Sequence, residues 1–264
     1  VPEEHGGGGM NCIQGLLVAE EIAWGCSGIG TAMEANGLAQ KPVIIGASDA
    51  LKKRYLEPMV NELGDGGRPI MCAYGVTEAG AGSDVAAMKT KAEKVGDKWI
   101  LNGSKMWITN GSMADVAVVW AQTGESGDTR SIRGFVVPTD TPGFSAKDQK
   151  GKLSLLASDT SELVFQDVAL PDGALMPDSD VGLKAPLMCL TQARYGISWG
   201  VVGAAMACFD EALSYAKQRV MFDTTIGAKQ IQQVRLADML TSITPGQLLT
   251  YRLGRMKDEG TMTP

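Results

Sequence analysis

Two stretches of the chain combine the residue types that could hold a planar ligand with a polar edge. The first, residues 71–84, is an apolar run that enters a loop of small residues, in which the hydroxyls of Thr77 and Ser83 flank several glycines. Glycines let a backbone approach a ligand closely. The second, residues 99–110, reads as a strand that ends at Trp107 beside a hydroxyl. Free amides, hydroxyls and an aromatic plate at two strand ends would suit a planar cofactor.

Each stretch alone is also typical of ordinary structure. Gly-Ala-Gly-Ser-Asp is a common turn composition, and a Trp at a strand end usually packs in a core. Two familiar nucleotide-binding motifs are excluded. A Rossmann fingerprint needs a third glycine where Val85 stands, and the Gly-Lys-Ser/Thr run of a Walker loop does not occur. The residue types by themselves therefore leave the ligand open.

The wording of the two stretches together resembles the FAD-binding signature of the acyl-CoA dehydrogenases. That family's pattern runs Val-Thr-Glu-Pro-Gly-Ala-Gly-Ser-Asp and then Asn-Gly-x-Lys-x-Trp-Ile-Thr-Asn, and this chain has Ala79 in place of the proline. Among the matched residues we expect Thr77 and Thr109 to hydrogen-bond the flavin edge and Trp107 to contact its ring. The resemblance implies FAD as the cofactor and, as its ligands here, Tyr74, Val76, Thr77, Gly82, Ser83, Trp107, Ile108 and Thr109.

A further family motif, Arg-x-x-Phe-Gly followed by a downstream Gln, corresponds to Arg219, Phe222 and Gln230. The resemblance implies that these residues bind the FAD of a neighbouring subunit, so we expect a homo-oligomer, a tetramer in the complete protein. Asp223 stands where the family has glycine, which places bulk and negative charge beside the expected pyrophosphate site. A competing interpretation of Arg219 is a cation that interacts with a helix C-terminus.

For the substrate, the resemblance implies acyl-CoA, with Ser83 and Arg194 at its pantetheine and nucleotide parts. The N-terminal half is most similar to medium-chain acyl-CoA dehydrogenases and the C-terminal half to glutaryl-CoA dehydrogenases. Gly30 stands where the latter place the arginine that holds a distal carboxylate, and Glu34 would repel that carboxylate. We therefore expect a short- or medium-chain acyl group. Decarboxylating glutaryl-CoA dehydrogenation is the alternative, and Glu34 could equally be a solvated helix residue.

The chemistry implied by the resemblance needs a catalytic base that this chain does not evidently contain. A carboxylate removes the α-proton while the β-hydrogen passes as hydride to the flavin, which gives trans-2-enoyl-CoA, and an electron-transfer flavoprotein accepts the electrons. The family's Tyr-Glu-Gly-Thr run has no counterpart, and Ala193 occupies the position where a minority of relatives carry the base. We therefore name no catalytic residue and expect a chain that is incomplete at both ends. Loss of a base costs roughly 10²–10⁴ in rate, so an inactive fragment that binds flavin or acyl-CoA is a third hypothesis.

The composition argues against several other classes of protein. A chain of 264 residues with 44% hydrophobic residues can bury a large core, and a net charge of −6 argues against a nucleic-acid partner. The single histidine, His5, and five cysteines without a C-x-x-C pair argue against a metal site. No apolar run is long enough for a transmembrane segment. We expect a cytoplasmic protein if it is bacterial and a mitochondrial matrix protein if it is eukaryotic.

Hydrophobic periodicity predicts the elements that must position these residues. Helical spacing runs from Asn11, a plausible N-cap, to Gly25, then over 28–38, and again from Ser48. Short β-rich runs follow at 71–74, 99–101, 116–121, 134–138 and 162–170.

Turn and boundary signals complete the prediction. Asn102-Gly103 and Pro142-Gly143 are turn dipeptides, and the charged residues 89–98 indicate a solvated sheet edge. After Gly182 a helix is expected to reach Arg219, and another begins near Lys229 and is expected to kink or break at Pro245. The result is an α+β protein with a helical part at 1–68, a central antiparallel β domain of the sandwich or barrel kind at 69–178, and a second helical part at 179–264.

Overall fold

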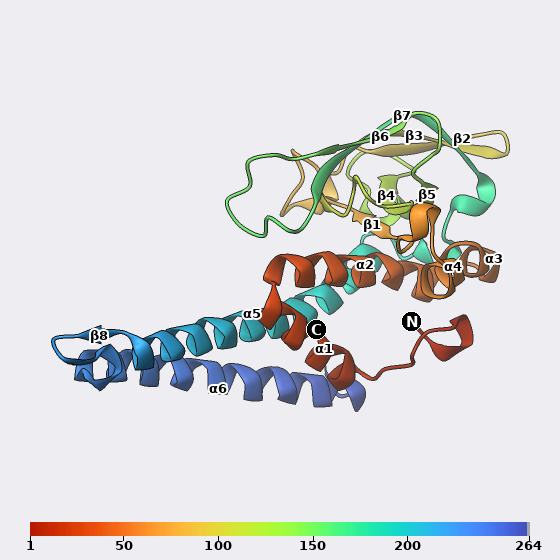
Figure 1. Ribbon diagram of the computed structural model, residues 1–264. Coiled ribbons are helices and arrows are strands. Elements are labelled where there is room, and N and C mark those ends of the chain that lie inside the picture. The colour runs from red at the N-terminus through yellow and green to blue at the C-terminus, as the bar shows by residue number, and fades with distance from the viewer. Residues whose placement is uncertain (263–264) are drawn as a thin grey trace. The chain divides into compact units, whose positions relative to one another are not determined.

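A curled β-sheet occupies the middle of the sequence, and helices precede and follow it (Figure 1). The helices are α1 (Cys12–Gly25), α2 (Ser27–Gly46), α3 (Asp49–Leu51), α4 (Glu57–Asn61), α5 (Lys184–Gln218) and α6 (Gln230–Asp258), with a π-helical turn (Lys52–Leu56) between α3 and α4. The strands are β1 (Cys72–Gly75), β2 (Lys91–Val95), β3 (Lys98–Thr109), β4 (Val116–Gln122), β5 (Ile132–Pro138), β6 (Phe144–Asp148) and β7 (Thr160–Pro171), with a separate hairpin of β8 (Val220–Met221) and β9 (Thr224–Thr225). The α+β class expected from the sequence is confirmed.

The computed structural model describes residues 1–262, which divide into two compact units. The sheet unit contains Val1–Gly9 and Ala32–Ala193, and the helical unit contains Met10–Thr31 and Arg194–Pro264. The chain passes from one unit to the other after Gly9, again within α2, and a third time within α5.

The sheet follows the order β1-β4-β2-β3-β7-β6. Strand β5 lies off this path and also pairs with β4. In Figure 1, β2, β3, β6 and β7 lie above β1, β4 and β5, so the sheet folds over on itself. Most pairs are antiparallel, as predicted, but β1 pairs with β4 in parallel from Cys72↔Val116 to Gly75↔Val119. This parallel pair sets the direction in which the loop after β1 leaves the sheet.

Strand β4 is buried along its whole length because it separates two hydrophobic cores. Successive side chains of a strand point to opposite faces. Val116, Val118 and Trp120 belong to a core that continues into α2, whereas Val119 and the small alanines of β4 belong to a core inside the curl, with Phe165. A strand that is buried on both faces reads as a continuous apolar run, which is what its sequence shows.

The predicted helix starts are confirmed by their caps. The Asn11 side chain accepts from the Gln14 amide, and the Gln14 side chain accepts from the Asn11 amide, which is a capping box. The Ser48 hydroxyl accepts from the Leu51 amide at 3.3 Å and so begins α3. Helix α2, expected to end near residue 38, continues to Gly46 with Pro42 inside it.

The prediction of a turn at Asn102-Gly103 was wrong. Both residues lie inside β3, where the pairing with β7 shifts register between Leu101 and Gly103. Gly103 has φ 141°, and the Asn102 side chain bonds Asp167 on β7 through both its oxygen and its nitrogen, so the dipeptide serves a β-bulge. The two-residue turn of the β2–β3 hairpin is Gly96-Asp97, while Pro142-Gly143 does form the expected turn.

Three other expectations need correction. Strand β2, expected as a solvated edge, is mostly exposed but pairs with β3 along its length and with β4 at Lys91↔Gln122. Strand β6 was not predicted, because none of its residues is fully buried and its sequence shows no apolar run. Of the kink or break expected at Pro245, the break does not occur, because helix α6 continues through this residue. The exposure of Thr241 and Pro245 explains this continuity, because the carbonyl that loses its donor can bind water.

In the helical unit, α5 and α6 run side by side (Figure 1), and glycines bring the helices close together. A Cβ at Gly203 on α5 would overlap the backbone carbonyl oxygen of Glu20 on α1, and one at Gly254 on α6 would overlap the Tyr195 hydroxyl. Leu16, Tyr195 and Trp199 form the small core beside these crossings.

Candidate functional site

The loop that follows β1 is joined to β3 by a hydrogen bond of 2.8 Å from the Met106 amide, in β3, to the Thr77 carbonyl oxygen, in the loop. This bond lies outside the regular ladders and fixes the loop that follows β1 against β3. Thr77 and Trp107, which are far apart in sequence, are therefore brought to the same part of the sheet unit. The structure thus links the two segments that the sequence singled out, and their binding of a cofactor stays a prediction.

Trp107 occupies an unusual backbone position. It has φ 63° and sits in a β-bulge, since the β3–β7 register shifts between Lys105 and Ile108. A left-handed conformation costs a non-glycine residue roughly 1–2 kcal/mol. The bulge turns the indole outward, and Trp107 is 61% exposed while Lys105 and Ile108 on either side are buried. Strain combined with an exposed aromatic side chain is typical of a ligand-binding position.

Several hydrogen-bonding groups in the loop after β1 and at the end of β3 have no partner among the described residues. The hydroxyls of Thr77, Ser83 and Thr109 bond to no other group among residues 1–262. The same holds for the backbone amides of Gly80 and Gly82, and a Cβ at either glycine would have no atom within 4 Å. Such groups need water or a ligand. The arrangement therefore has hydroxyls and amides available for the polar edge of a planar molecule.

The remaining predicted ligands in this part have buried side chains. Val76 and Ile108 pack in the two cores of the sheet. Tyr74 is also buried, and its hydroxyl donates to the Pro186 carbonyl oxygen at 3.1 Å. Burial raises the pKa of Tyr74 well above its usual value, so the phenol stays neutral. These residues can reach a ligand only through their backbone.

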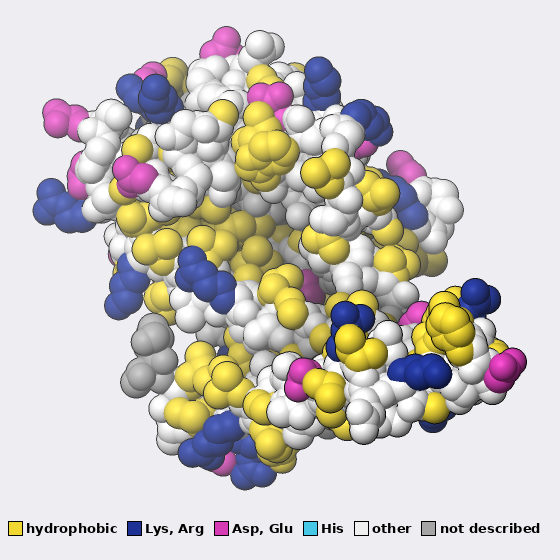
Figure 2. Space-filling view, turned by 90° about the vertical axis from the view of Figure 1, so that its left-hand side faces the viewer, with side chains coloured by type: hydrophobic (Ala, Val, Ile, Leu, Met, Phe, Trp, Pro, Cys, Tyr) yellow, Lys and Arg dark blue, Asp and Glu magenta, His cyan; other side chains and the backbone are white. Residues whose placement is uncertain are grey.

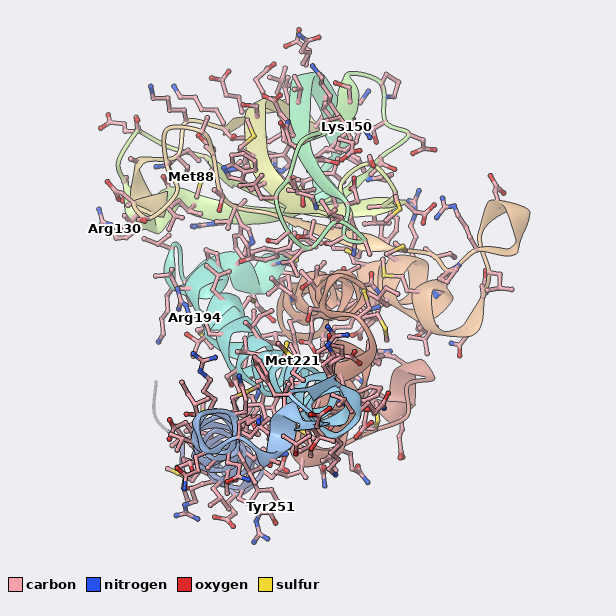
Figure 3. The ribbon with its side chains drawn as sticks, turned by 60° about the vertical axis from the view of Figure 1, so that its left-hand side comes forward. Met88, Arg130, Lys150, Arg194, Met221 and Tyr251 are labelled. Carbon is pink, nitrogen blue, oxygen red and sulfur yellow. The ribbon has the colours of Figure 1, made fainter. Side chains whose placement is uncertain are left out.

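Apolar side chains are also exposed near the end of β3. Figure 2 shows hydrophobic side chains over much of the face that it presents. The loop after β6, which begins near Lys150 (Figure 3), carries the exposed Leu153 and Leu156. A hydrogen bond of 3.3 Å from the Asn110 amide to the Asp159 carbonyl oxygen holds the end of this loop beside β3.

Two residues of the signature were overlooked as site residues, Glu78 and Lys105. Their side chains form a buried ion pair, with Nζ 2.8 Å from Oε1 and side-chain exposures of 9% and 0%. Burial lowers the pKa of Lys105 to about 8, and the Glu78 carboxylate opposes that change. Burial alone would raise the pKa of Glu78, but the Lys105 charge and three hydrogen bonds outweigh it and lower the pKa. A lysine at an inward position of a strand was the signal that could have identified the pair.

The second group of predicted FAD ligands lies in one connection of the helical unit, between α5 and α6. Arg219 precedes β8, Phe222 and Asp223 form the two-residue turn of the β8–β9 hairpin, and Gln230 begins α6. Both turn residues are left-handed, with φ 55° and 58°, and Phe222 is 87% exposed. Arg219 is exposed and has no ion pair with any residue of the described chain.

The predicted substrate residues are divided between the two units. Ser83 is exposed on the loop after β1 in the sheet unit, and Arg194 is exposed on the part of α5 that belongs to the helical unit (Figure 3). On α2, Gly30 is buried and Glu34 is half-buried with interactions of its own, so Glu34 is not a fully solvated residue. Ala193 offers no base, and α5 has no Asp or Glu before Asp210.

The donor set fits a flavin and offers no place for a metal. A flavin presents carbonyls and ring nitrogens along one edge and an aromatic face, which match the free hydroxyls and amides and the exposed indole of Trp107. Within residues 1–262, no group of three or more His, Cys, Asp or Glu side chains could hold a metal ion.

Family models match the chain almost from end to end. The acyl-CoA dehydrogenase N-terminal domain matches residues 1–63, the middle domain residues 73–168 and the C-terminal domain residues 180–264. The chain belongs to the acyl-CoA dehydrogenase family.

Relatives within the acyl-CoA dehydrogenase family come from several of its branches. A probable medium-chain specific acyl-CoA dehydrogenase 2, mitochondrial, of Caenorhabditis briggsae is 34% identical over 98% of this chain and 63% of its own length. A glutaryl-CoA dehydrogenase structure from Mycobacterium smegmatis is 46% identical, with a TM-score of 0.91 over 98% of this chain and 64% of that one. A second such structure, in complex with FADH2, is 41% identical with the same TM-score and the same shares. The structure of butyryl-CoA dehydrogenase from Megasphaera elsdenii is 33% identical, with a TM-score of 0.91 over 98% of this chain and 68% of that one.

The chain spans less than two thirds of the length of the curated acyl-CoA dehydrogenase relatives that it matches, 63% in the first and 61% in the human short-chain specific enzyme. Among the described residues, no helix has both the length and the apolar character that crossing a membrane requires.

Proposed function

We propose that this chain forms the flavin- and acyl-CoA-binding part of an FAD-dependent acyl-CoA dehydrogenase. The observation that carries the proposal is that the hydroxyls of Thr77, Ser83 and Thr109 have no partner among the described residues. They lie in the two segments that the Met106–Thr77 hydrogen bond joins, and Trp107 of the second segment is exposed. When bound, FAD would supply the capacity to accept a hydride from the β-carbon of an acyl-CoA. This chain's part is to hold the flavin edge with Thr77 and Thr109, to cover its ring with Trp107, and to bind CoA through Ser83 and Arg194.

A second set of FAD contacts would come from another copy of the chain. Arg219, Phe222 and Gln230 lie close together in sequence on one connection and are exposed, which suits contacts with a ligand held elsewhere. We therefore propose a homo-oligomer, a tetramer in the complete protein. Asp223 adds a negative charge next to this set and would weaken binding of the pyrophosphate.

The proposed substrate is a short- or medium-chain acyl-CoA that is converted to trans-2-enoyl-CoA. Gly30 supplies no cation for a second carboxylate, and Glu34 is an acid on the same helix. Glutaryl-CoA is the competing substrate, because the glutaryl-CoA dehydrogenase structure shares 46% identity, more than the 34% of the medium-chain relative. Since no residue of this chain is assigned as the base, a binding fragment without turnover is the third candidate.

The expected partner is an electron-transfer flavoprotein, as the resemblance implies. A mitochondrial location is proposed for a eukaryotic source, supported by the names of the curated relatives, and a cytoplasmic one for a bacterial source. We also propose the domain bounds 1–68, 69–178 and 179–264.

The test is an anaerobic titration of the FAD-supplemented chain with octanoyl-CoA and, separately, glutaryl-CoA, followed at the flavin band near ~450 nm. Perturbation of the band without bleaching is the expected result, because flavin and acyl-CoA would bind without a base. Bleaching by octanoyl-CoA would mean that these residues contain a base. Bleaching by glutaryl-CoA alone would favour glutaryl-CoA as the substrate. Failure to retain FAD would overturn the proposal for this chain.

A further inference from the structure

The loop from Thr77 to Asp84 has few contacts of its own. Glu78 and Ala81 exchange two backbone hydrogen bonds of 3.2 and 3.1 Å, which make a tight turn. Gly80, Gly82 and Ser83 are exposed. Because most of its residues are exposed and its backbone makes few hydrogen bonds, the loop would open readily if nothing else held it.

The Glu78 carboxylate connects this loop to the segment that leads into β2. It accepts from the Lys89 amide at 2.6 Å and from the Thr90 amide at 3.0 Å. It also accepts from Lys105 Nζ at 2.8 Å. One carboxylate therefore holds the residues after the loop and a residue of β3 at the same time.

Lys105 connects the same point to the residue before the loop. Its Nζ donates to the Val76 carbonyl oxygen at 3.2 Å and lies 4.0 Å from Met88 Sδ. The Lys105 side chain is fully buried, and its methylenes pack against Gly75, where a Cβ would come within 3.3 Å of Lys105 Cγ. The ion pair thus fixes Val76, the residue directly before the loop, and Lys89, in the segment that follows the loop.

A buried ion pair is a weak source of stability, because removing two charges from water costs about as much as their attraction returns. Replacing such a pair by apolar side chains of similar volume is often neutral or stabilising. Apart from the bond between its own members, the pair makes three hydrogen bonds to the segments that flank the loop, at Val76, Lys89 and Thr90. A pair that contributes little net stability but makes these directional contacts acts on the loop's geometry. We propose that Glu78 and Lys105 are positioning residues that hold the loop from Thr77 to Asp84 in its ligand-binding form.

This inference rests on the proposed function in one respect: the ligand is taken to be the flavin. The pair touches neither the free hydroxyl of Thr77 nor that of Ser83. It acts on them by fixing the backbone from which they project. A displacement of about 1 Å in a binding group can cost on the order of 10²-fold.

The test compares the apolar double variant Glu78→Leu/Lys105→Met with a matched control, Asp115→Leu/Arg68→Met. The control pair also joins a carboxylate to a cation and to a backbone amide, that of Met71 at 2.9 Å, before β1. Three quantities are measured: the urea midpoint without FAD, FAD affinity by fluorescence quenching, and backbone amide exchange without FAD. The informative amides are those of Ala81 and Met106, since their acceptors are backbone carbonyls that no variant removes.

We expect the Glu78→Leu/Lys105→Met chain to keep its urea midpoint and to lose tenfold or more in FAD affinity. The backbone amide hydrogens of Ala81 and Met106 should exchange at least tenfold faster than in wild type. The control should change FAD affinity by less than threefold. If the double variant folds poorly, the isosteric variant Glu78→Gln takes its place. Because that variant is itself expected to be less stable than wild type, its loop exchange is referenced to the amides of β4 in the same protein.

Exchange at Ala81 and Met106 that rises no more than exchange in β4 would overturn the proposal, as would an unchanged FAD affinity. If wild type itself binds no FAD, the proposed function fails. The exchange rates still decide whether the pair holds the loop.

Discussion

The Asp258 carboxylate, at the last residue of α6, accepts a hydrogen bond of 2.8 Å from the backbone amide of Cys12, the first residue of α1. It also accepts from the Ile13 amide at 3.3 Å. The first amides of a helix have no acceptor inside the helix. A residue from the far end of the sequence therefore completes the cap that Asn11 begins.

This relationship predicts that Asp258→Ala lowers the free energy of unfolding by about 1 kcal/mol, the usual cost of losing a helix cap. Glu259→Ala is the matched control, because it removes only an exposed i,i+4 pair with Arg255 and should cost less than about 0.5 kcal/mol. Urea denaturation followed by circular dichroism measures both. Equal losses in the two variants would mean that Asp258 does not cap α1.

Gly203 offers a second test of the helical unit. Gly203→Ala places a methyl group on the Glu20 carbonyl oxygen, so α1 and α5 must move apart. We expect a loss of about 1–3 kcal/mol in unfolding free energy. Gly15→Ala, in α1 with open space around it, should instead stabilise by up to about 1 kcal/mol through helix propensity. Opposite signs in denaturation curves support the close crossing, and a harmless Gly203→Ala contradicts it.

Substitutions of Trp107 should change FAD affinity more than they change the free energy of unfolding. Trp107→Gly relieves the left-handed backbone, so the free energy of unfolding should change by less than about 1 kcal/mol. FAD affinity should fall about tenfold, which corresponds to about 1.4 kcal/mol, because the aromatic contact is lost. Trp107→Phe, which keeps a ring, should lose less. Fluorescence titration with FAD distinguishes the three proteins, and equal affinities would remove Trp107 from the site.

Removal of the Asp223 carboxylate should increase the affinity for FAD. The φ of this residue, 58°, favours glycine, so Asp223→Gly should be neutral or should stabilise the chain by up to about 1 kcal/mol. If its charge weakens FAD binding, both Asp223→Gly and Asp223→Asn should bind FAD more tightly, by threefold or more at low salt. Asn tolerates the left-handed region and removes only the charge, so it isolates the electrostatic part. Affinities equal to wild type in both variants would show that the charge does not reach the cofactor.

Glu78 predicts a pH dependence. Because its pKa in the folded chain lies below the ordinary value of 4.5, its contribution to stability is complete above pH 4.5 and is lost as pH falls through the folded pKa. In that range the unfolded chain binds more protons, so the free energy of unfolding decreases with acid. Glu78→Gln lacks this titration and should be less stable than wild type at pH 7, with a difference in unfolding free energy that narrows as pH falls below 4.5. Urea midpoints across that range test this, and a constant gap would contradict it.

Much of the fold could be predicted from local signals. The cap residues Asn11 and Ser48 mark helix starts because their side chains bond amides three residues away, which needs no tertiary contact. The apolar runs at β4 and β5 were recognised because burial on both faces removes polar residues. The turn predicted at Asn102-Gly103 was wrong because a dipeptide that suits a tight turn also suits a β-bulge, and local sequence does not distinguish the two.

The sequence by itself determined the family, the α+β order of elements and the two stretches that carry the candidate site, because these depend on residue type and spacing. Only the tertiary structure decided which of those residues are available to a ligand. It buried the side chains of Tyr74, Val76 and Ile108 and left the Thr77 hydroxyl and the Trp107 indole open. It also paired Glu78 with Lys105 across 27 residues of sequence. Availability and pairing follow from which strands become neighbours, and that depends on how the whole chain buries its apolar surface.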